Sequence, residues 1–185
     1  MPIIKSEEAE RRAVLMVADL MAASARTSPK ARGVDNITTA IVTGKEKDEV
    51  AAVMEKLGEE RKMHNFVRDS RNVRNSEAVL LVGVKSGKGE GDLDCGACGY
   101  STCKELEDAE RLKGRDFVSP SCILVALDLG IALGSAVKMA SELNVDNRVM
   151  YTVGVAAKQM GLLDADVIIG VPLSVSGKNL YYDRK

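Results

Sequence analysis

The order of apolar and polar residues along the chain predicts helices that alternate with short strands. A helix is expected over about residues 7–25, because the Ser6 hydroxyl can cap free N–H groups and the two acids after it complement the positive end of the helix dipole. A charged amphipathic helix is expected over residues 45–62. Three apolar runs are short enough to be buried strands, at residues 37–43, 78–85 and 166–172.

The second half of the chain begins with a glycine-rich stretch, residues 86–94, that is expected to be a flexible loop. A long apolar helix is expected from Cys122 to about Asn144, and Asp146 can cap another helix that ends near Gly161. No sequence period repeats. The alternation of strands and helices predicts a layered domain of the α+β or α/β class, without fixing the order of the strands.

Composition supports one domain over residues 1–185, with residues 86–122 as a cysteine-rich insertion. The chain is 45% hydrophobic, and its 29% of charged residues nearly cancel to a formal net charge of −1. This balance argues against nucleic acid or an anionic membrane as a partner. The N-terminus lacks a secretory pattern, so a cytoplasmic location is expected. The apolar stretch 123–137 is interrupted by Asp128 and is shorter than the roughly 20 residues of a membrane span, which indicates a core helix.

The chain has four cysteines, Cys95, Cys98, Cys103 and Cys122, in the pattern C-x2-C-x4-C-x18-C. Disulfides are disfavoured because nothing in the sequence points to an oxidising compartment. Structural zinc is a serious alternative, although zinc sites usually combine two short paired knuckles. Unligated thiols or a redox sensor are further alternatives. Three close ligands and a remote fourth fit an iron–sulfur cluster best.

The residues around the cysteines agree with a cluster. Gly96 and Gly99 permit positive φ, so that backbone N–H groups can turn toward anionic sulfur atoms. Cys122 stands where the long apolar helix begins, and the positive end of that helix would face the same charge. The preceding Pro120 and Ser121 are also ordinary helix-start residues.

The segment CGACGYSTCKE resembles the four-iron cluster domain of the corrinoid iron–sulfur protein and of acetyl-CoA decarbonylase/synthase. This resemblance implies a [4Fe-4S] cluster with Cys122 as its fourth ligand. Over its full length the chain is similar to uncharacterised ferredoxin-domain proteins of anaerobic bacteria and archaea. That similarity rests on RTSPKARGVDN, CGACGYSTC and GVPLSVSGKNLYYDR.

A second candidate site follows the first helix, where Arg26, Ser28, Lys30 and Arg32 could converge on a phosphate. The alternative is that these cations only complement the negative end of the helix dipole. The stretch RTSPK resembles the R-x-S-x-R turn of flavin-dependent nitroreductases, with Lys30 in place of the expected arginine. VAAKQMGLLDADVIIGVP resembles their late helix and core strand. This resemblance implies a nitroreductase-like fold, bound FMN and a homodimer.

Three other features carry expectations. Gly130 and Gly134 make a smooth helix face that would let another helix approach closely. Asp128 is expected to be a paired carboxylate. His64 is the only histidine, lies in a polar stretch and is expected at the surface, which disfavours Ser–His–Asp hydrolysis.

Together these patterns predict a cytoplasmic iron–sulfur protein that transfers electrons in anaerobic metabolism. Its electrons would pass to a redox partner protein or a small-molecule acceptor. The enzyme version of the hypothesis adds FMN and makes the protein a nitroreductase-like oxidoreductase. The competing hypothesis is a module in which zinc or a cluster is purely structural and has no redox turnover.

Overall fold

The computed structural model describes residues 3–89 and 92–182. Its centre is a four-stranded sheet in the order β1-β2-β6-β5, in which all neighbouring strands are antiparallel. An all-antiparallel sheet with separate helical layers places the chain in the α+β class. The strand bounds are β1 Ile37–Thr43, β2 Ala78–Val84, β5 Asp146–Asn147 and β6 Val167–Ser174.

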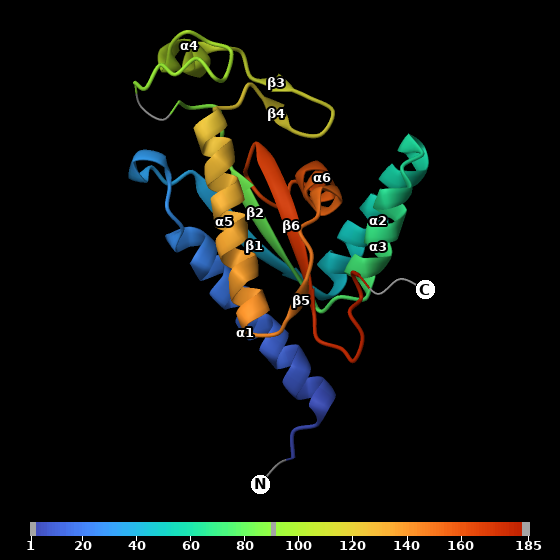
Figure 1. Cartoon of the computed structure of the whole chain (residues 1–185). Coiled ribbons are helices and arrows are strands. Elements are labelled where there is room, and N and C mark those ends of the chain that lie inside the picture. Colours follow the sequence, from blue (N-terminus) through green and yellow to red (C-terminus); the bar gives the residue numbers. More distant parts are fainter. Residues whose placement is uncertain (1–2, 90–91, 183–185) are drawn as a thin grey trace.

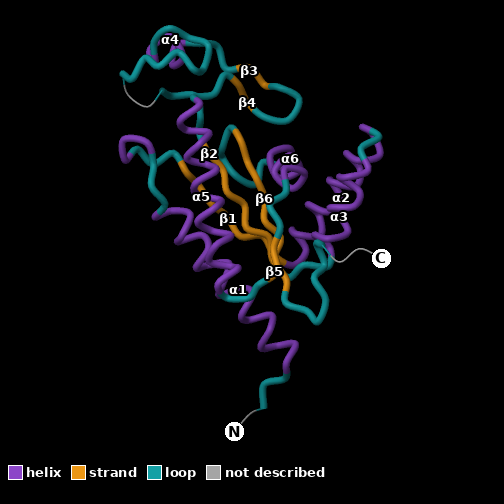
Figure 2. The backbone as a smooth tube through the Cα atoms, in the orientation of Figure 1, coloured by secondary structure: helices purple, strands orange, loops and turns teal. Residues whose placement is uncertain are grey.

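Helices cover both faces of this sheet (Figures 1 and 2). Side chains of β2 alternate between the two layers: Leu80 and Val82 pack with one group of helices, whereas Val79 and Leu81 pack with the other. This period of two explains why all of β2 is buried. On one face lie α1 Ser6–Thr27 and α5 Ile123–Glu142; on the other lie α2 Gly44–Arg61, α3 His64–Arg74 and α6 Tyr151–Met160.

Two contacts fix the layers closely. Between α1 and α5, the Ser24 and Ser135 hydroxyl oxygens lie 2.8 Å apart. Between α6 and β6, the backbone approaches so closely that a Cβ at Gly154 would lie 1.7 Å from the Ile168 carbonyl oxygen. Only glycine fits there, so this residue determines how closely α6 covers the sheet.

Most elements occur where the sequence predicts them, with four differences. Ser6 is helical, and Lys5 precedes the helix without a side-chain cap. The last helix starts at Tyr151, because Asp146 belongs to β5 and pairs with Ser174. Helix α3 was not predicted, because its sequence is polar, and His64 is exposed at its start as expected. Strand β1 lies at the edge of the sheet and is mostly half-buried rather than buried.

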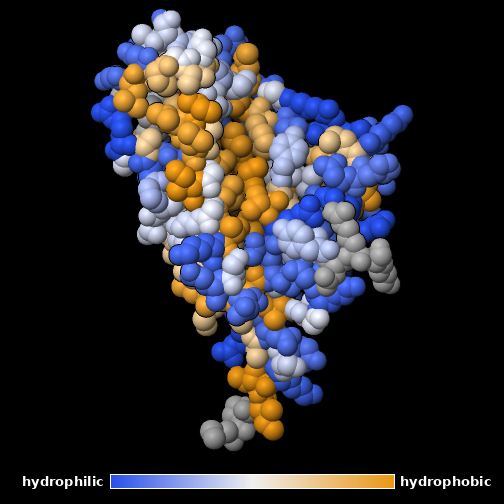
Figure 3. Space-filling model, viewed as in Figure 1, coloured by the Kyte–Doolittle hydropathy of each residue, from blue (hydrophilic) through white to orange (hydrophobic). Residues whose placement is uncertain are grey.

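Helix α5 is long and apolar enough to cross a membrane by length and composition, with a mean hydropathy of 1.8. It packs here against α1 and the sheet, as expected of a core helix. The prediction that another helix packs closely against Gly130 and Gly134 is wrong within this chain, because a Cβ at either position would meet no atom within 4 Å. The outer face of α5 exposes the apolar side chains of Ile123, Leu127 and Ile131. Figure 3 shows hydrophobic surface along this helix.

The cysteine-rich segment lies beyond one end of the sheet, next to the start of α5 (Figure 1). It contains a short helix and a two-stranded hairpin: α4 Cys103–Asp108, β3 Leu112–Lys113 and β4 Val118–Ser119. Within residues 92–121, Leu106 is the single buried side chain. The segment therefore has almost no hydrophobic core of its own.

Candidate metal centre

The four cysteines line one pocket between the cysteine-rich segment and the start of α5. Cys95 is exposed, Cys98 and Cys103 are half-buried and Cys122 is buried, and all four are free thiols. The structure thus brings together the ligand set that the sequence predicts. Apolar side chains complete the walls: Leu93, Tyr100, Leu106, Ile123 and Leu124.

Local hydrogen bonds fix the start of α4, where Cys103 lies. Asp94 accepts a hydrogen bond from the Cys103 N–H at 2.7 Å. Thr102 Oγ1 accepts one from the Glu105 N–H at 3.2 Å, and the Glu105 carboxylate accepts one from the Ser101 N–H at 2.9 Å. This pattern is close to a capping box, but the Glu105 carboxylate accepts from Ser101, one residue before the N-cap Thr102. The sequence S-T-C-K-E could have indicated it.

Cys122 is held from the other side. It is the N-cap residue of α5, and its N–H donates to the Ser86 carbonyl oxygen at 2.8 Å. The Ser86 and Ser121 hydroxyl oxygens also lie 2.7 Å apart. These bonds join the end of β2 to the start of α5, so the fourth thiol is positioned by the main domain rather than by the cysteine-rich segment.

Glycines shape the turn between the first two cysteines and the third. Gly96 and Gly99 have φ of 71° and 90°, as the sequence predicts. The Gly99 N–H donates to the Gly96 carbonyl at 3.0 Å, so this donor closes the turn instead of pointing at a sulfur atom. A third glycine was not anticipated: a Cβ at Gly89 would lie 2.9 Å from Cys103 Sγ, so the loop backbone passes directly beside this thiol.

The donor set suits a metal centre, since four thiolates are the usual ligands of iron–sulfur clusters and of structural zinc. In residues 3–89 and 92–182, however, no three Cys, His, Asp or Glu side chains converge closely enough to hold a single metal ion. The four thiols instead surround a shared pocket.

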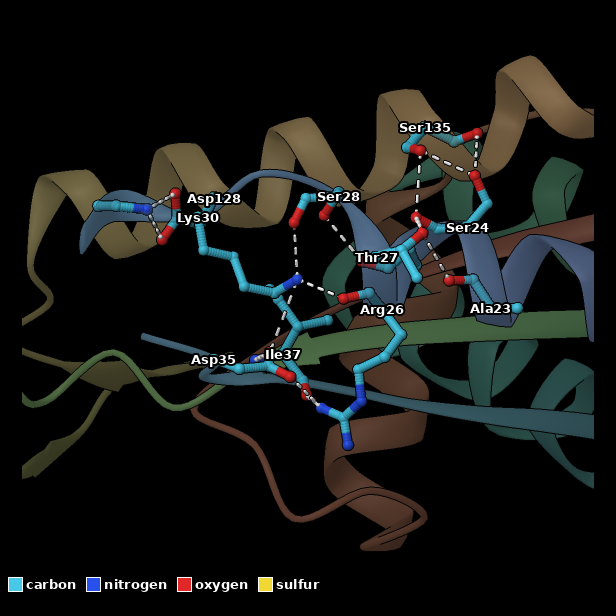
Figure 4. A network of polar contacts seen from close by, with 12 residues as sticks. Ala23, Ser24, Arg26, Thr27, Ser28, Lys30, Asp35, Ile37, Asp128 and Ser135 are labelled. Atoms are coloured by element: carbon cyan, nitrogen blue, oxygen red, sulfur yellow. Dashed lines mark hydrogen bonds and ion pairs between the residues drawn. The ribbon is translucent and has the colours of Figure 1, made fainter. Parts of the chain in front are cut away.

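The Arg26–Arg32 turn, the second predicted site, uses its polar groups internally (Figure 4). Lys30 Nζ donates to the carbonyl oxygens of Arg26 and Ser28, at 2.5 and 2.8 Å. Arg26 Nη1 donates to Asp35 at 2.6 Å and to the Ile37 carbonyl at 2.8 Å. The buried Ser28 hydroxyl donates to the Ala25 carbonyl at 2.7 Å. These three residues thus stabilise the C-terminal end of α1, and an FMN phosphate would have to displace bonds already made.

Asp128 ties this turn to α5. It is 3% exposed, and both carboxylate oxygens accept from the Ala31 N–H, at 3.0 and 3.1 Å. The expected pairing of Asp128 is confirmed. Arg32 follows in the short 3-10 helix Ala31–Gly33, with a left-handed φ of 53°. Asp128 lies six residues after Cys122, about 9 Å along the α5 axis, so the turn is anchored to the helix that begins at the fourth thiol.

Comparison with known families gives a match over residues 118–184 to the family described as "uncharacterized protein containing a ferredoxin domain" (DUF2148). This segment includes Cys122 and begins after the other three cysteines. An uncharacterized protein from Archaeoglobus fulgidus is 45% identical over 182 residues, which cover 98% of this chain and 97% of the relative.

Solved structures with a similar fold include nitroreductases and an oxidoreductase containing FMN. A putative NADH dehydrogenase/NAD(P)H nitroreductase from Bacteroides thetaiotaomicron matches 96% of this chain and 77% of its own, with a TM-score of 0.54 and 10% identity. A nitroreductase with bound FMN from Desulfitobacterium hafniense matches 96% and 81%, with a TM-score of 0.52 and 12% identity. The expected nitroreductase-like fold is confirmed.

Proposed function

The chain belongs to the family of proteins that contain a ferredoxin domain, and on that premise we propose that it is an iron–sulfur electron-transfer protein. The family and the nitroreductase-like fold both support a redox role of the oxidoreductase kind. In this proposal Cys95, Cys98, Cys103 and Cys122 hold one [4Fe-4S] cluster. The observation that carries it is that four free thiols line one pocket. Within residues 92–121, which contain three of these thiols, Leu106 is the single buried side chain.

Such a segment needs a bound group to hold it together. Small units without a sufficient core are usually stabilised by disulfides or metal ligation. The thiols here form no disulfide. A cluster bound by three thiols of the segment and by Cys122 of the main domain would fasten the two together. Structural zinc is the alternative, because four thiolates are also among its usual ligands.

The surroundings of the pocket suit a negatively charged centre. Cys122 caps the N-terminus of a 20-residue helix, whose dipole favours negative charge at that end. Tyr100 and Leu124 line the pocket and limit the access of water, one of the factors that set a cluster potential. Exposed Cys95 leaves one edge accessible to an electron-transfer partner. A bound cluster would supply reversible one-electron transfer.

The test is purification without oxygen, followed by visible absorption before and after dithionite and by iron and zinc analysis. We expect a broad brown band that bleaches on reduction, and iron rather than zinc. A colourless, zinc-containing protein would overturn the proposal and would leave the structural-metal hypothesis in its place.

The second candidate function is a flavin-dependent oxidoreductase, favoured by the fold shared with the FMN-containing nitroreductase over 96% of this chain. FMN would use Arg26, Ser28, Lys30 and Arg32 as its phosphate site and would lie near the cysteine pocket along α5. Its test is reconstitution with FMN, removal of free flavin by desalting, and absorption of the protein fraction. Release of all flavin on desalting would count against this candidate.

The proposal extends to the partner, the location and the oligomeric state. The partner would be a redox protein or a small-molecule electron acceptor, and the location cytoplasmic. Two copies would pair as a homodimer, for which the exposed apolar face of α5 offers a surface. Sedimentation of the full chain over a range of concentrations tests the pairing, and a single monomeric species throughout would refute it.

A further inference from the structure

A second cavity, of about 700 Å³, lies between the β3–β4 hairpin and the helices α2 and α6. This basic cavity has no lining residue in common with the cysteine pocket. Its volume is in the range of small-molecule binding sites. Its charged lining consists of five cationic side chains and one carboxylate, namely Arg61, Arg111, Lys113, Arg115, Lys158 and Asp116.

The carboxylate is already neutralised by contacts within the protein. Asp116 accepts a hydrogen bond from Arg61 Nη1 at 2.6 Å and another from the Tyr151 hydroxyl. Burial raises the pKa of Asp116, but the hydrogen bonds from Tyr151 and Arg61 outweigh burial and bring its net pKa below the ordinary 3.8. The Asp116 charge is therefore compensated by Arg61, and the rest of the lining remains strongly positive.

Two other cationic side chains of the basic cavity are held by bonds within the protein. Arg111 forms an ion pair with Asp166 at 2.9 Å and also donates to the Pro120 carbonyl. Lys158 donates to the Ala165 carbonyl. The side chains of Lys113 and Arg115, by contrast, are exposed on the hairpin and make no hydrogen bond or ion pair within residues 3–89 and 92–182. The charge of Arg115 does help to lower the pKa of Asp116. Lys113 and Arg115 are the groups that remain available to a ligand.

An aromatic ring lies beside these two cations. Phe117 lines the basic cavity and is half-buried, held by an edge-on contact with Tyr151 at 5.6 Å between ring centroids. Val118 and Val155 add apolar surface. Cationic side chains beside an aromatic ring match a ligand that has both phosphate groups and a flat ring.

We propose that the basic cavity binds a nucleotide, with Lys113 and Arg115 on its phosphates and its base against Phe117. Because the hairpin belongs to the cysteine-rich segment, binding would join this segment to α6 at a point separate from the four thiols. The inference does not depend on what the thiols hold, since no cysteine lines the basic cavity.

The test is calorimetric titration of the full chain, purified without oxygen, with ADP and in parallel with tripolyphosphate. The charge-reversed double variant Lys113→Glu/Arg115→Glu should weaken ADP binding about tenfold or more, because two charge-assisted contacts are lost. The matched control is Lys5→Glu/Arg12→Glu, which changes the net charge equally at two exposed positions of the N-terminal region. It should bind ADP like the unmodified protein.

A Phe117→Ala variant tests the base contact separately and should weaken ADP binding more than tripolyphosphate binding. Three results would overturn the proposal: no saturable ADP binding, an equal loss in both double variants, or tripolyphosphate binding as tight as that of ADP. Circular dichroism of each variant checks that it folds, and iron analysis shows separately whether the cysteine site is intact.

Discussion

Three thiols of the cysteine-rich segment and Cys122 of the main domain line a common pocket, whereas at the Arg26–Arg32 turn the polar side chains bond to the protein's own backbone. Both stretches contain residue types that suit a cofactor. They differ in what the fold has left available. A sequence motif indicates chemistry, but the chemistry needs groups whose hydrogen bonds and charges are not already used inside the chain.

The largest effect is expected when one of the four thiols is removed. In Cys103→Ser the weaker serine oxygen replaces a half-buried ligand, and we expect most of the iron and of the visible absorption to be lost. The change is small in volume, so folding of the main domain should persist. Iron analysis and visible absorption of protein purified without oxygen measure the effect.

The matched control is Ser101→Ala, an exposed position two residues away. The backbone N–H of Ser101 donates to the Glu105 carboxylate, and its hydroxyl makes no hydrogen bond within the described ranges. This variant should keep its iron. Full iron loading in Cys103→Ser would show that this thiol is not a ligand, and equal losses in both variants would point to general disruption of the segment.

The next largest effect is expected at Asp128, which joins the turn to α5. Asp128→Ala leaves the Ala31 N–H without its acceptor and should lower the free energy of unfolding by about 2 kcal/mol. Asp128→Asn keeps an acceptor oxygen and should cost less. Urea denaturation gives both values. Unchanged stability in Asp128→Ala would mean that the turn does not depend on this carboxylate.

Lys30 tests whether the turn is structural. Its side chain is 6% exposed and donates to two carbonyl oxygens at the end of α1. Lys30→Met should therefore lower the free energy of unfolding by about 1.5 kcal/mol in the absence of any ligand. Lys45→Met is the control, because that side chain is 85% exposed, and it should cost less than about 0.5 kcal/mol.

The same two variants also test whether the Arg26–Arg32 turn binds the phosphate of FMN. FMN at a hundred times its dissociation constant would stabilise a protein that binds it by about 2.7 kcal/mol. If FMN stabilises the unmodified protein and Lys45→Met but not Lys30→Met, the turn is a phosphate site despite its internal bonds. If FMN stabilises none of them, the turn is structural only.

Local sequence patterns were sufficient where local chemistry decides the structure. The β-branched run of β1 and the apolar run of β2 have the predicted positions, and Gly161 ends α6 with a φ of 68°. Asp146 was misread as a helix cap because its pairing with Ser174 is a contact between distant parts of the chain. The local pattern contains no information about such a partner.

The candidate sites also differ in whether local sequence could predict them. The cysteine spacing alone predicted which four thiols would meet, because three of them are neighbours and the fourth starts a recognisable helix. The internal bonds of Lys30 could not be predicted, because they depend on how the turn folds back on α1. The basic cavity was missed altogether, since Arg61, Arg115 and Lys158 come from three separate elements.

The smallest effect concerns how the cysteine-rich segment is attached to the main domain. Burial, and then the hydrogen bond to Asp116, raise the pKa of Tyr151 to about 12. Because this folded-state pKa exceeds the ordinary value of about 10, the contribution to stability is complete below about pH 10 and is lost as the pH rises toward 12. Tyr151 is 42% exposed, so solvent screening should limit the loss to about 1 kcal/mol or less.

Tyr151→Phe removes this titration and should show a smaller fall in the free energy of unfolding between about pH 9 and about pH 11 than the unmodified protein does. Urea denaturation at the two pH values measures the difference. Other groups titrate in both proteins, so only the difference between them is diagnostic. Tyr182→Phe is the control, because Tyr182 lines a different pocket, with Ser141 and Asn147, and the Arg148 guanidinium lies over its ring. A parallel pH dependence in all three proteins would show that ionisation of Tyr151 does not loosen the hairpin, which the Arg61–Asp116 and Arg111–Asp166 ion pairs would then hold.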